Sequence, residues 1–240
     1  MIIAAARMAK RSLGRGWCLF VPMLAGASLR DRLLACVGAL IGVAMTGLVC
    51  SFAGVGSLAP LLVAPIGASA VLLFAVPASP LAQPWAIAGG NVISALVGVT
   101  VAHLGLSPLI AGGVAVAGAI LAMSLARCLH PPGGAVALTA VLGGPAAMTA
   151  GWAFSLVPVG INSLALVLLG IAYHRWSGHS YPHRPVAVVG HTPPAVGNLI
   201  HAEDLDLALA DLGETFDVAR EDLELLFRQM AFHASRRRRA

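Results

Sequence analysis

The middle of the sequence almost lacks charge. From Leu33 to His174 the only Asp, Glu, Lys or Arg residue is Arg127, and charged residues make up 10% of the 240-residue chain. Hydrophobic residues make up 58% of the chain, and its mean hydropathy is +0.87. Apolar runs of about 20 residues recur, each long enough to cross a hydrocarbon core of about 30 Å. These properties predict an all-α polytopic membrane protein.

Acidic residues are nearly absent before the C-terminal tail. Asp31 is the only one before residue 203, whereas the same stretch holds nine Lys and Arg residues. A pathway built from this stretch offers a cation no second carboxylate, but it offers an anion positive charge and backbone N–H groups. The charge distribution therefore disfavours cation transport.

Catalytic and metal-binding patterns are also missing. The chain has no H-E-x-x-H, no G-x-S-x-G and no carboxylate pair in its apolar region. Its four cysteines show no C-x-x-C spacing, which favours packing residues over a metal site or a disulfide framework. We therefore expect no enzyme activity, cofactor, metal or nucleic-acid partner. A Ser–His dyad of Ser69 and His130 is the weaker enzymatic alternative.

Composition divides the chain into four regions. Residues 1–32 are basic and predict a cytoplasmic or interfacial arm in preference to a cleavable signal peptide. A transmembrane domain at 33–176, a solvated linker at 177–202 and cytosolic amphipathic helices within 203–240 follow. The predicted apolar segments of the membrane domain are 33–53, 58–76, 85–104, 109–129, 131–142 and 151–173.

An internal repeat runs through the membrane domain. The stretch 65–72 aligns with 131–138 at Pro, Gly and Leu. Asn91 follows the first stretch and Asn162 follows the second, and each of these Asn residues lies twelve residues before a His. The order predicts two three-segment repeats with Pro/Gly-interrupted half-helices. The repeats are inverted if the interrupted segments cross, giving six spans, and parallel if these are re-entrant, giving four. Both termini are expected in the cytoplasm.

Interrupted helices at corresponding positions of two halves indicate a midplane binding site. Glycine N–H groups and the positive ends of the half-helices would face a small anion, with hydroxyl, amide, imidazole and guanidinium donors around it. In the structural alternative the glycines allow close packing, the asparagines bond between helices and Arg127 reaches to headgroups. The predicted substrate-binding residues are Pro65, Gly67, Ala68, Ser69, Asn91, Arg127, His130, Pro131, Pro132, Gly133, Gly134, Thr139 and Asn162.

The segment His130-Pro-Pro-Gly-Gly-Ala135, preceding Ala137-Leu138, resembles the signature of the HPP family of integral membrane proteins. The earlier run 64–74, followed by Pro80-Leu-Ala-Gln-Pro84, is similar to a second motif of that family. The resemblance covers residues 17–176. It implies a small bacterial or plastid membrane protein, with nitrite transport described for plant members. Val136 stands where several members have Thr, so a hydroxyl of the family is missing here.

The leading hypothesis is a membrane transporter or channel for a small inorganic anion, nitrite or nitrate first. We expect it in the inner cell membrane, with multiple passes, and as a homo-oligomer in the lipid bilayer. The alternative is a non-transporting membrane scaffold or sensor whose cytosolic tail recruits a partner.

Overall fold

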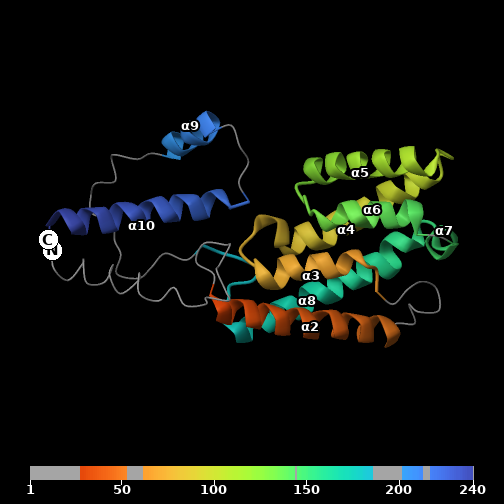
Figure 1. Cartoon of the computed structure of the whole chain (residues 1–240), viewed down its shortest axis with the longest axis horizontal. Coiled ribbons are helices and arrows are strands. Elements are labelled where there is room, and N and C mark those ends of the chain that lie inside the picture. The colour runs from red at the N-terminus through yellow and green to blue at the C-terminus, as the bar shows by residue number, and fades with distance from the viewer. Residues whose placement is uncertain (1–27, 53–61, 144, 186–201, 213–216, 240) are drawn as a thin grey trace, which may run out of the picture.

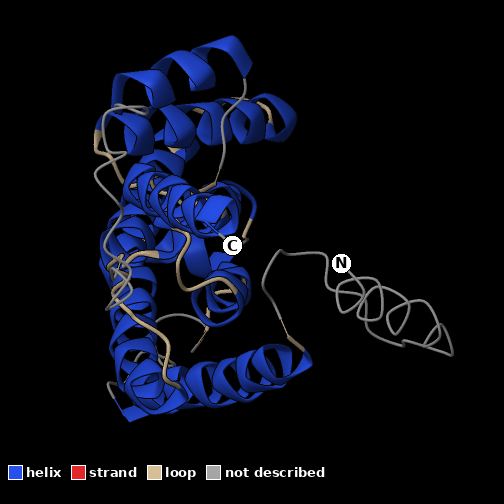
Figure 2. Ribbon diagram, turned by 90° about the vertical axis from the view of Figure 1, so that its left-hand side faces the viewer, coloured by secondary structure: helices blue, strands red, loops and turns tan. Residues whose placement is uncertain are grey.

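The membrane domain is built from helices. The computed structural model describes residues 28–52, 62–143, 145–185, 202–212 and 217–239, and these ranges contain no β-strand (Figures 1 and 2). By length and composition, four stretches are able to span a bilayer: α2 (Leu29–Phe52), α4 (Pro84–Ala102), α5 (Pro108–Leu125) and Ser155–Ser177, where η3 (Ser155–Gly160) continues into α8 (Ile161–Ser177). The prediction of an all-α polytopic membrane protein is confirmed.

Two further apolar helices are about half as long. α3 (Pro65–Ala75) and α6 (Pro132–Leu142) have 11 residues each. Eleven residues give about 16 Å of helix, against a hydrocarbon core of about 30 Å. Both helices begin with proline, whose fixed φ suits a first turn and whose missing N–H has no helical partner there in any case. The half-helices predicted from the two Pro/Gly motifs are therefore present.

Successive membrane helices run in opposite directions (Figure 1). Near the end of α8, the Tyr173 hydroxyl donates to the Leu34 carbonyl at the start of α2, at 2.7 Å. At the start of α2, Arg32 Nη2 donates to the Ala75 carbonyl at the end of α3, at 3.0 Å. The starts of α2 and the ends of α3 and α8 thus meet. Because the direction alternates from each membrane helix to the next, α5 runs opposite to α2, α6 opposite to α3, and α8 opposite to α4 (Figure 1).

The helices pack as two groups of three. α2, α3 and α8 contact one another, as do α4, α5 and α6, and the groups meet where α4 packs against η3 and α3 against α6. Small residues permit this packing: a Cβ on Gly42 of α2 would lie 2.6 Å from the Phe74 ring, and one on Gly98 of α4 would lie 2.6 Å from the Ala137 carbonyl. Such close approach is the usual basis of helix association in membranes.

Several boundaries differ from the sequence prediction. α5 ends at Leu125 and not at residue 129, because Arg127 has a φ of 53° that is incompatible with a right-handed helix. The last membrane helix continues to Ser177, four residues further than expected. The predicted turns contain two short helices that the sequence did not indicate, η2 (Pro80–Ala82) and α7 (Pro145–Ala150).

The chain after α8 packs against the membrane domain before it reaches the tail. Tyr181 is only 7% exposed, and its hydroxyl donates to the Ala82 carbonyl at 2.9 Å. Burial raises the pKa of Tyr181 above its ordinary value, which keeps the hydroxyl protonated. The prediction of a solvated linker over 177–202 is therefore wrong for its first residues. Residues 186–201 lie outside the described ranges, as do residues 1–27 of the predicted N-terminal arm.

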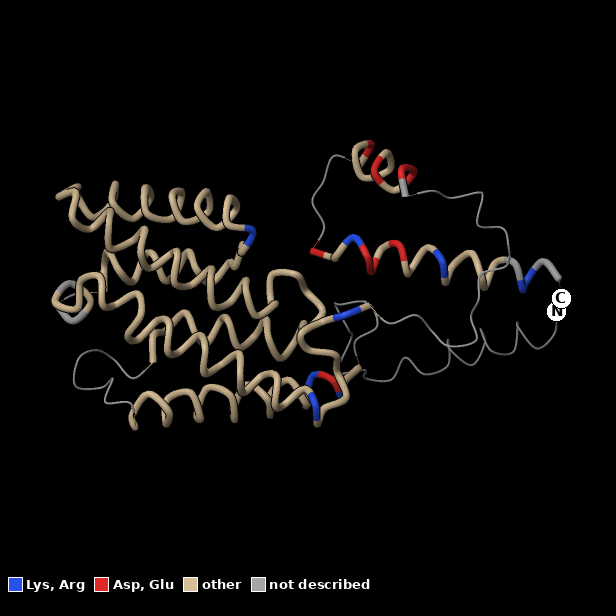
Figure 3. The backbone as a smooth tube through the Cα atoms, turned by 180° about the vertical axis from the view of Figure 1, so that it is seen from behind, with Lys and Arg blue, Asp and Glu red and all other residues tan. Residues whose placement is uncertain are grey.

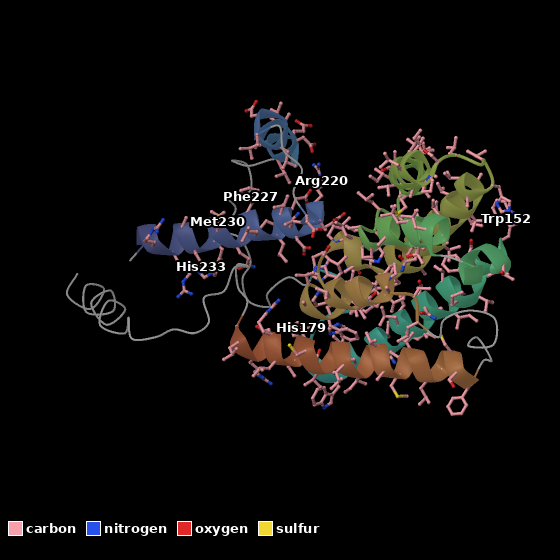
Figure 4. All side chains as sticks on the ribbon, turned by 45° about the vertical axis from the view of Figure 1, so that its right-hand side comes forward. Trp152, His179, Arg220, Phe227, Met230 and His233 are labelled. Carbon is pink, nitrogen blue, oxygen red and sulfur yellow. The ribbon has the colours of Figure 1, made fainter. Side chains whose placement is uncertain are left out.

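Two helices form the described part of the tail, as the amphipathic pattern predicts. α9 (Ala202–Leu212) and α10 (Arg220–Arg239) are joined by an ion pair between the Arg220 guanidinium and the Asp206 carboxylate. The hydrogen bond from Arg220 lowers the pKa of Asp206. α10 extends away from the membrane helices, and Phe227 and Met230 project from it (Figures 1 and 4).

Candidate functional site

Four polar side chains meet in the centre of the membrane domain and are completely buried. They are Ser69 of α3, Asn91 of α4, His130 just before α6, and Ser163 of α8, each with 0% exposure. His130 Nε2 lies 2.8 Å from Ser69 Oγ, while Asn91 Nδ2 donates to Ser69 Oγ at 3.3 Å and to Ser163 Oγ at 3.0 Å. We call these four residues the core polar cluster. All three hydrogen bonds connect the α2–α3–α8 group to the α4–α5–α6 group.

The backbone of the turn between α3 and α4 sets the orientation of the His130 ring. His130 Nδ1 lies 2.8 Å from the Leu81 carbonyl in η2, which only accepts hydrogen bonds, so Nδ1 carries a proton. In the neutral ring Nε2 is then the acceptor, and the Ser69 hydroxyl donates to it. Gly90 leaves room for this arrangement, since a Cβ there would lie 2.7 Å from the His130 Cβ.

The cluster retains unused hydrogen-bonding capacity. Asn91 Oδ1 and the hydroxyl of Ser155 in η3 are buried, and neither has a hydrogen-bond partner among the described residues. Buried polar groups are nearly always satisfied by protein, water or a ligand, because an unpaired group in an apolar interior costs about 1–3 kcal/mol. Within the cluster, Asn91 Oδ1 is therefore the acceptor to which a small polar molecule would donate a hydrogen bond.

The glycine amides expected to bind an anion are already engaged. The N–H groups of Gly67, Gly133 and Gly134 each donate to the carbonyl three residues earlier, at N–O distances of 3.1, 2.8 and 3.1 Å. The prediction that these amides are free to face an ion is wrong for this arrangement of the backbone. Their helices still direct positive dipole ends toward the centre of the domain.

The two motif glycines that begin the half-helices have different surroundings. A Cβ on Gly133 would lie 2.5 Å from Ser94 Oγ and 2.9 Å from Met123 Sδ, so this glycine allows α6 to approach α4 and α5. A Cβ on Gly67 would meet nothing within 4 Å, and Gly67 is exposed. Gly133 thus fits the structural alternative of close packing, whereas Gly67 lies on an open face of α3.

Several predicted site residues lie outside the core polar cluster. Arg127 is exposed beyond the end of α5. The Thr139 hydroxyl donates to a carbonyl of its own helix, that of Ala135, at 2.8 Å. Asn162 accepts from Val63 N at 3.1 Å and therefore ties the chain before α3 to α8.

The remaining predicted residues frame the two helix starts. Pro65 and Pro132 are buried at the first position of α3 and α6, Gly134 is half-buried, and Ala68 and Pro131 are exposed. Sequence reasoning missed Ser163, Ser155 and the Leu81 carbonyl. Ser163 follows Asn162 directly, so a hydroxyl next to an intramembrane amide was the available signal. The carbonyl of Leu81 has no sequence signal because every residue carries one.

The cluster has the chemistry of a neutral binding site. It contains no Lys, Arg, Asp or Glu, and the described residues hold no group of three or more His, Cys, Asp or Glu side chains that would fit a metal ion. Hydroxyl and amide groups both donate and accept, and a neutral imidazole donates through one ring nitrogen and accepts through the other. Such a set suits a small polar molecule, or an anion that enters together with a proton.

Comparison with known proteins gives one family and two relatives. The family described as HPP, transmembrane region, matches residues 24–182. Two transmembrane proteins of Dictyostelium discoideum are similar to the chain: one is 35% identical over 120 residues, and the other is 36% identical over 126 residues. These matches cover 48% and 50% of this chain but only 38% and 44% of the relatives. No solved structure matches.

Proposed function

We propose that this chain, which belongs to the HPP family of transmembrane proteins, carries a small inorganic oxoanion, nitrite or nitrate, across a membrane. The observation that carries the proposal is the core polar cluster, because its three hydrogen bonds are buried and cross the boundary between the two three-helix groups. A polar contact at that boundary is broken and remade whenever the groups move relative to one another. A substrate that replaces those contacts is therefore coupled to the movement.

The cluster supports an oxoanion that enters with a proton. The Ser69 and Ser163 hydroxyls turn to donate to the oxygens, and the Asn91 amide donates through Nδ2 or accepts through Oδ1. His130 Nε2, which accepts in the neutral ring, takes up the accompanying proton and becomes a charged donor. The pair of anion and proton carries no net charge, which matches a buried site without fixed charge.

Complete burial favours a carrier over an open pore. Each member of the cluster has 0% exposure, so in the part of the chain that the structure describes these side chains are closed off from solvent. Access requires the α2–α3–α8 group to move against the α4–α5–α6 group, first on one side of the membrane and then on the other. The opposed directions of α2 and α5, α3 and α6, and α4 and α8 support inverted repeats as the basis of this rocking (Figure 1).

The distribution of basic residues supports a cytoplasmic position for both termini. Arg30 and Arg32 lie in the first turn of α2, Arg127 follows α5, and Arg175 is in the last turn of α8. The helix directions bring these positions to one end of the domain, where basic residues gather (Figure 3). Positive residues favour the cytoplasmic side, which in a bacterial cell is that of the inner membrane.

An exposed face of α3 supports a homo-oligomer. Ala64, Gly67, Ala68 and Val71 recur at helical spacing and are exposed. The helix is too short to span a bilayer, so lipid would meet the backbone at its ends, where polar groups are poorly tolerated. A second copy packed on this small-residue face would cover that backbone.

A scaffold or sensor without transport activity is the second candidate function. It is favoured by α10, on which Leu226 is 54% and Met230 57% exposed. Because these apolar side chains lie on a helix that projects from the membrane domain, they are placed to contact a cytosolic partner (Figure 4).

Uptake into liposomes containing only the purified protein tests the proposal. We expect saturable uptake of nitrite and nitrate and no uptake of sodium, with at least a tenfold loss in His130→Gln. The matched control is Ser124→Ala, which removes an exposed hydroxyl that bonds the Ile120 carbonyl of its own helix. Folded wild-type protein that moves no anion would refute the proposal and favour the scaffold.

A further inference from the structure

The turn that carries η2 is held from both sides. On its inner side, the Leu81 carbonyl accepts the hydrogen bond from His130 Nδ1 at 2.8 Å. On its outer side, the Ser79 hydroxyl, with Ser79 only 6% exposed, donates to the two carboxylate oxygens of Asp217 at 2.8 and 3.0 Å. Asp217 lies in the tail, 138 residues further along the chain. A short series of hydrogen bonds through the η2 turn thus connects the cytosolic tail to the core polar cluster.

Ser79 connects the two sides directly. Its hydroxyl accepts the Leu81 N–H at 3.1 Å, which makes Ser79 the cap of the short η2 helix. When the Ser79 hydroxyl donates its hydrogen bond to Asp217, the lone pairs of Ser79 Oγ remain directed at that N–H. The carboxylate therefore fixes the Pro80–Leu81 peptide. The next peptide is held through the Ala82 N–H, which donates to the Ser79 carbonyl at 3.1 Å, and its Leu81 carbonyl in turn fixes the His130 ring.

Further bonds attach the same turn to the chain after α8 and to α10. The Gln83 side chain donates to the Ser79 carbonyl at 2.8 Å and accepts from His183 N at 2.9 Å. His183 Nε2 reaches both carboxylate oxygens of Asp222, in the first turn of α10, at 2.9 and 3.0 Å. The start of α10 thus docks on the η2 turn through two separate carboxylates, Asp217 and Asp222.

We propose that Ser79 and Asp217 are positioning residues of the transport site: the docked tail holds the Leu81 carbonyl in place, and this carbonyl keeps His130 in the tautomer with Nδ1 protonated and Nε2 facing Ser69. Release of the tail frees the turn and allows the other tautomer, in which Nε2 carries the proton and no longer accepts from Ser69. The transport consequence rests on the function proposed above. The control of the His130 tautomer by the tail does not depend on that function.

A direct test uses protein labelled with ¹⁵N-histidine, with the His130 ring signals assigned by their loss in His130→Gln. We expect Ser79→Ala and Asp217→Asn to shift the ring nitrogen signals toward the other tautomer and to slow nitrite uptake about three- to tenfold. Asp217→Glu, which keeps the carboxylate, is expected to restore most of both readouts. The matched control is Asp211→Asn, at an exposed carboxylate of α9 in the same tail.

The two readouts separate the inference from the proposed function. Unchanged His130 ring signals in both Ser79→Ala and Asp217→Asn would overturn the inference, because a purely structural anchor affects stability without altering the tautomer. Shifted ring signals in a protein that transports no anion would support the positioning role and refute transport. Equal effects of Asp211→Asn would also overturn the inference, since any loss of tail charge would then suffice.

Discussion

Ser69→Ala is the substitution with the clearest consequence for the core polar cluster. The Ser69 hydroxyl donates to His130 Nε2 at 2.8 Å and accepts from Asn91 Nδ2 at 3.3 Å. Alanine removes both bonds, together with the longer contact of the hydroxyl to the Pro65 carbonyl at 3.4 Å, without adding volume. Asn91 keeps its bond to Ser163, whereas Nε2 of His130 loses its partner in a place with 0% exposure.

The expected cost follows from these contacts. A hydrogen bond between side chains contributes about 0.6 kcal/mol on average inside a membrane protein, and a buried acceptor left without a partner costs about 1–3 kcal/mol. We expect Ser69→Ala to lower the free energy of unfolding by about 2 kcal/mol. For a domain of this size that corresponds to a fall in Tm of roughly 4–8 °C.

Thermal unfolding in detergent measures this cost, and the matched substitution Ser124→Ala supplies the control. The Ser124 hydroxyl is exposed and bonds only a carbonyl of its own helix, at 2.7 Å, so its loss is expected to change stability by less than about 0.5 kcal/mol. Nitrite uptake at equal amounts of folded protein is the second readout, and it should fall only in Ser69→Ala. A Tm for Ser69→Ala within 1 °C of the control would refute the claim that the cluster links the two helix groups.

Three further predictions concern packing, the segment after α8 and the tail. Gly133→Ala is expected to destabilise the protein by about 1–3 kcal/mol in thermal unfolding, while Gly113→Ala in α5 is expected to be nearly neutral, because Gly133 has atoms within 3 Å of the added methyl group and Gly113 has none within 4 Å; equal effects would contradict the packing described. Tyr181→Phe strips a buried backbone carbonyl of its donor and should lower stability by about 1–2 kcal/mol, and an unchanged Tm would count against that bond. Because the pKa of Asp206 is lowered, its ion pair with Arg220 is retained above the ordinary carboxyl pKa of about 3.9 and is lost as the pH falls through the lowered pKa. Distances between spin labels on α9 and α10 should therefore lengthen only below about pH 4. Asp206→Asn should abolish this pH dependence.

The sequence was sufficient to predict the helical scaffold and part of the site. Proline followed by glycine in two apolar segments predicted half-helices, and α3 and α6 begin at Pro65 and Pro132. Polar residues are costly in a membrane and must find partners, so Ser69, Asn91 and His130 were candidates for one site, and the structure brings them together. Composition and helix periodicity determine these features locally.

The remaining features depend on tertiary geometry. Asn91 and Asn162 occupy equivalent places in the sequence pattern, yet Asn91 joins the cluster while Asn162 accepts from Val63 N. The position of Arg127 follows from the left-handed backbone of that one residue, which its sequence context does not reveal. The engagement of the glycine amides depends on how each half-helix starts, and the importance of the Leu81 carbonyl depends on where the η2 turn meets His130.

A reversible crosslink between the two helix groups tests the central claim most directly. A Cβ on Gly160 of η3 would lie 3.6 Å from Val92 Cγ2 of α4, so these two positions face each other where the helix groups meet and are the pair to test as cysteines. The experiment uses Gly160→Cys with Val92→Cys in a variant whose four native cysteines are replaced by alanine and which retains nitrite uptake. We predict that oxidation stops uptake and that a reductant restores it. Uptake that continues at the same rate in fully crosslinked protein would contradict transport by movement of the two groups around the core polar cluster.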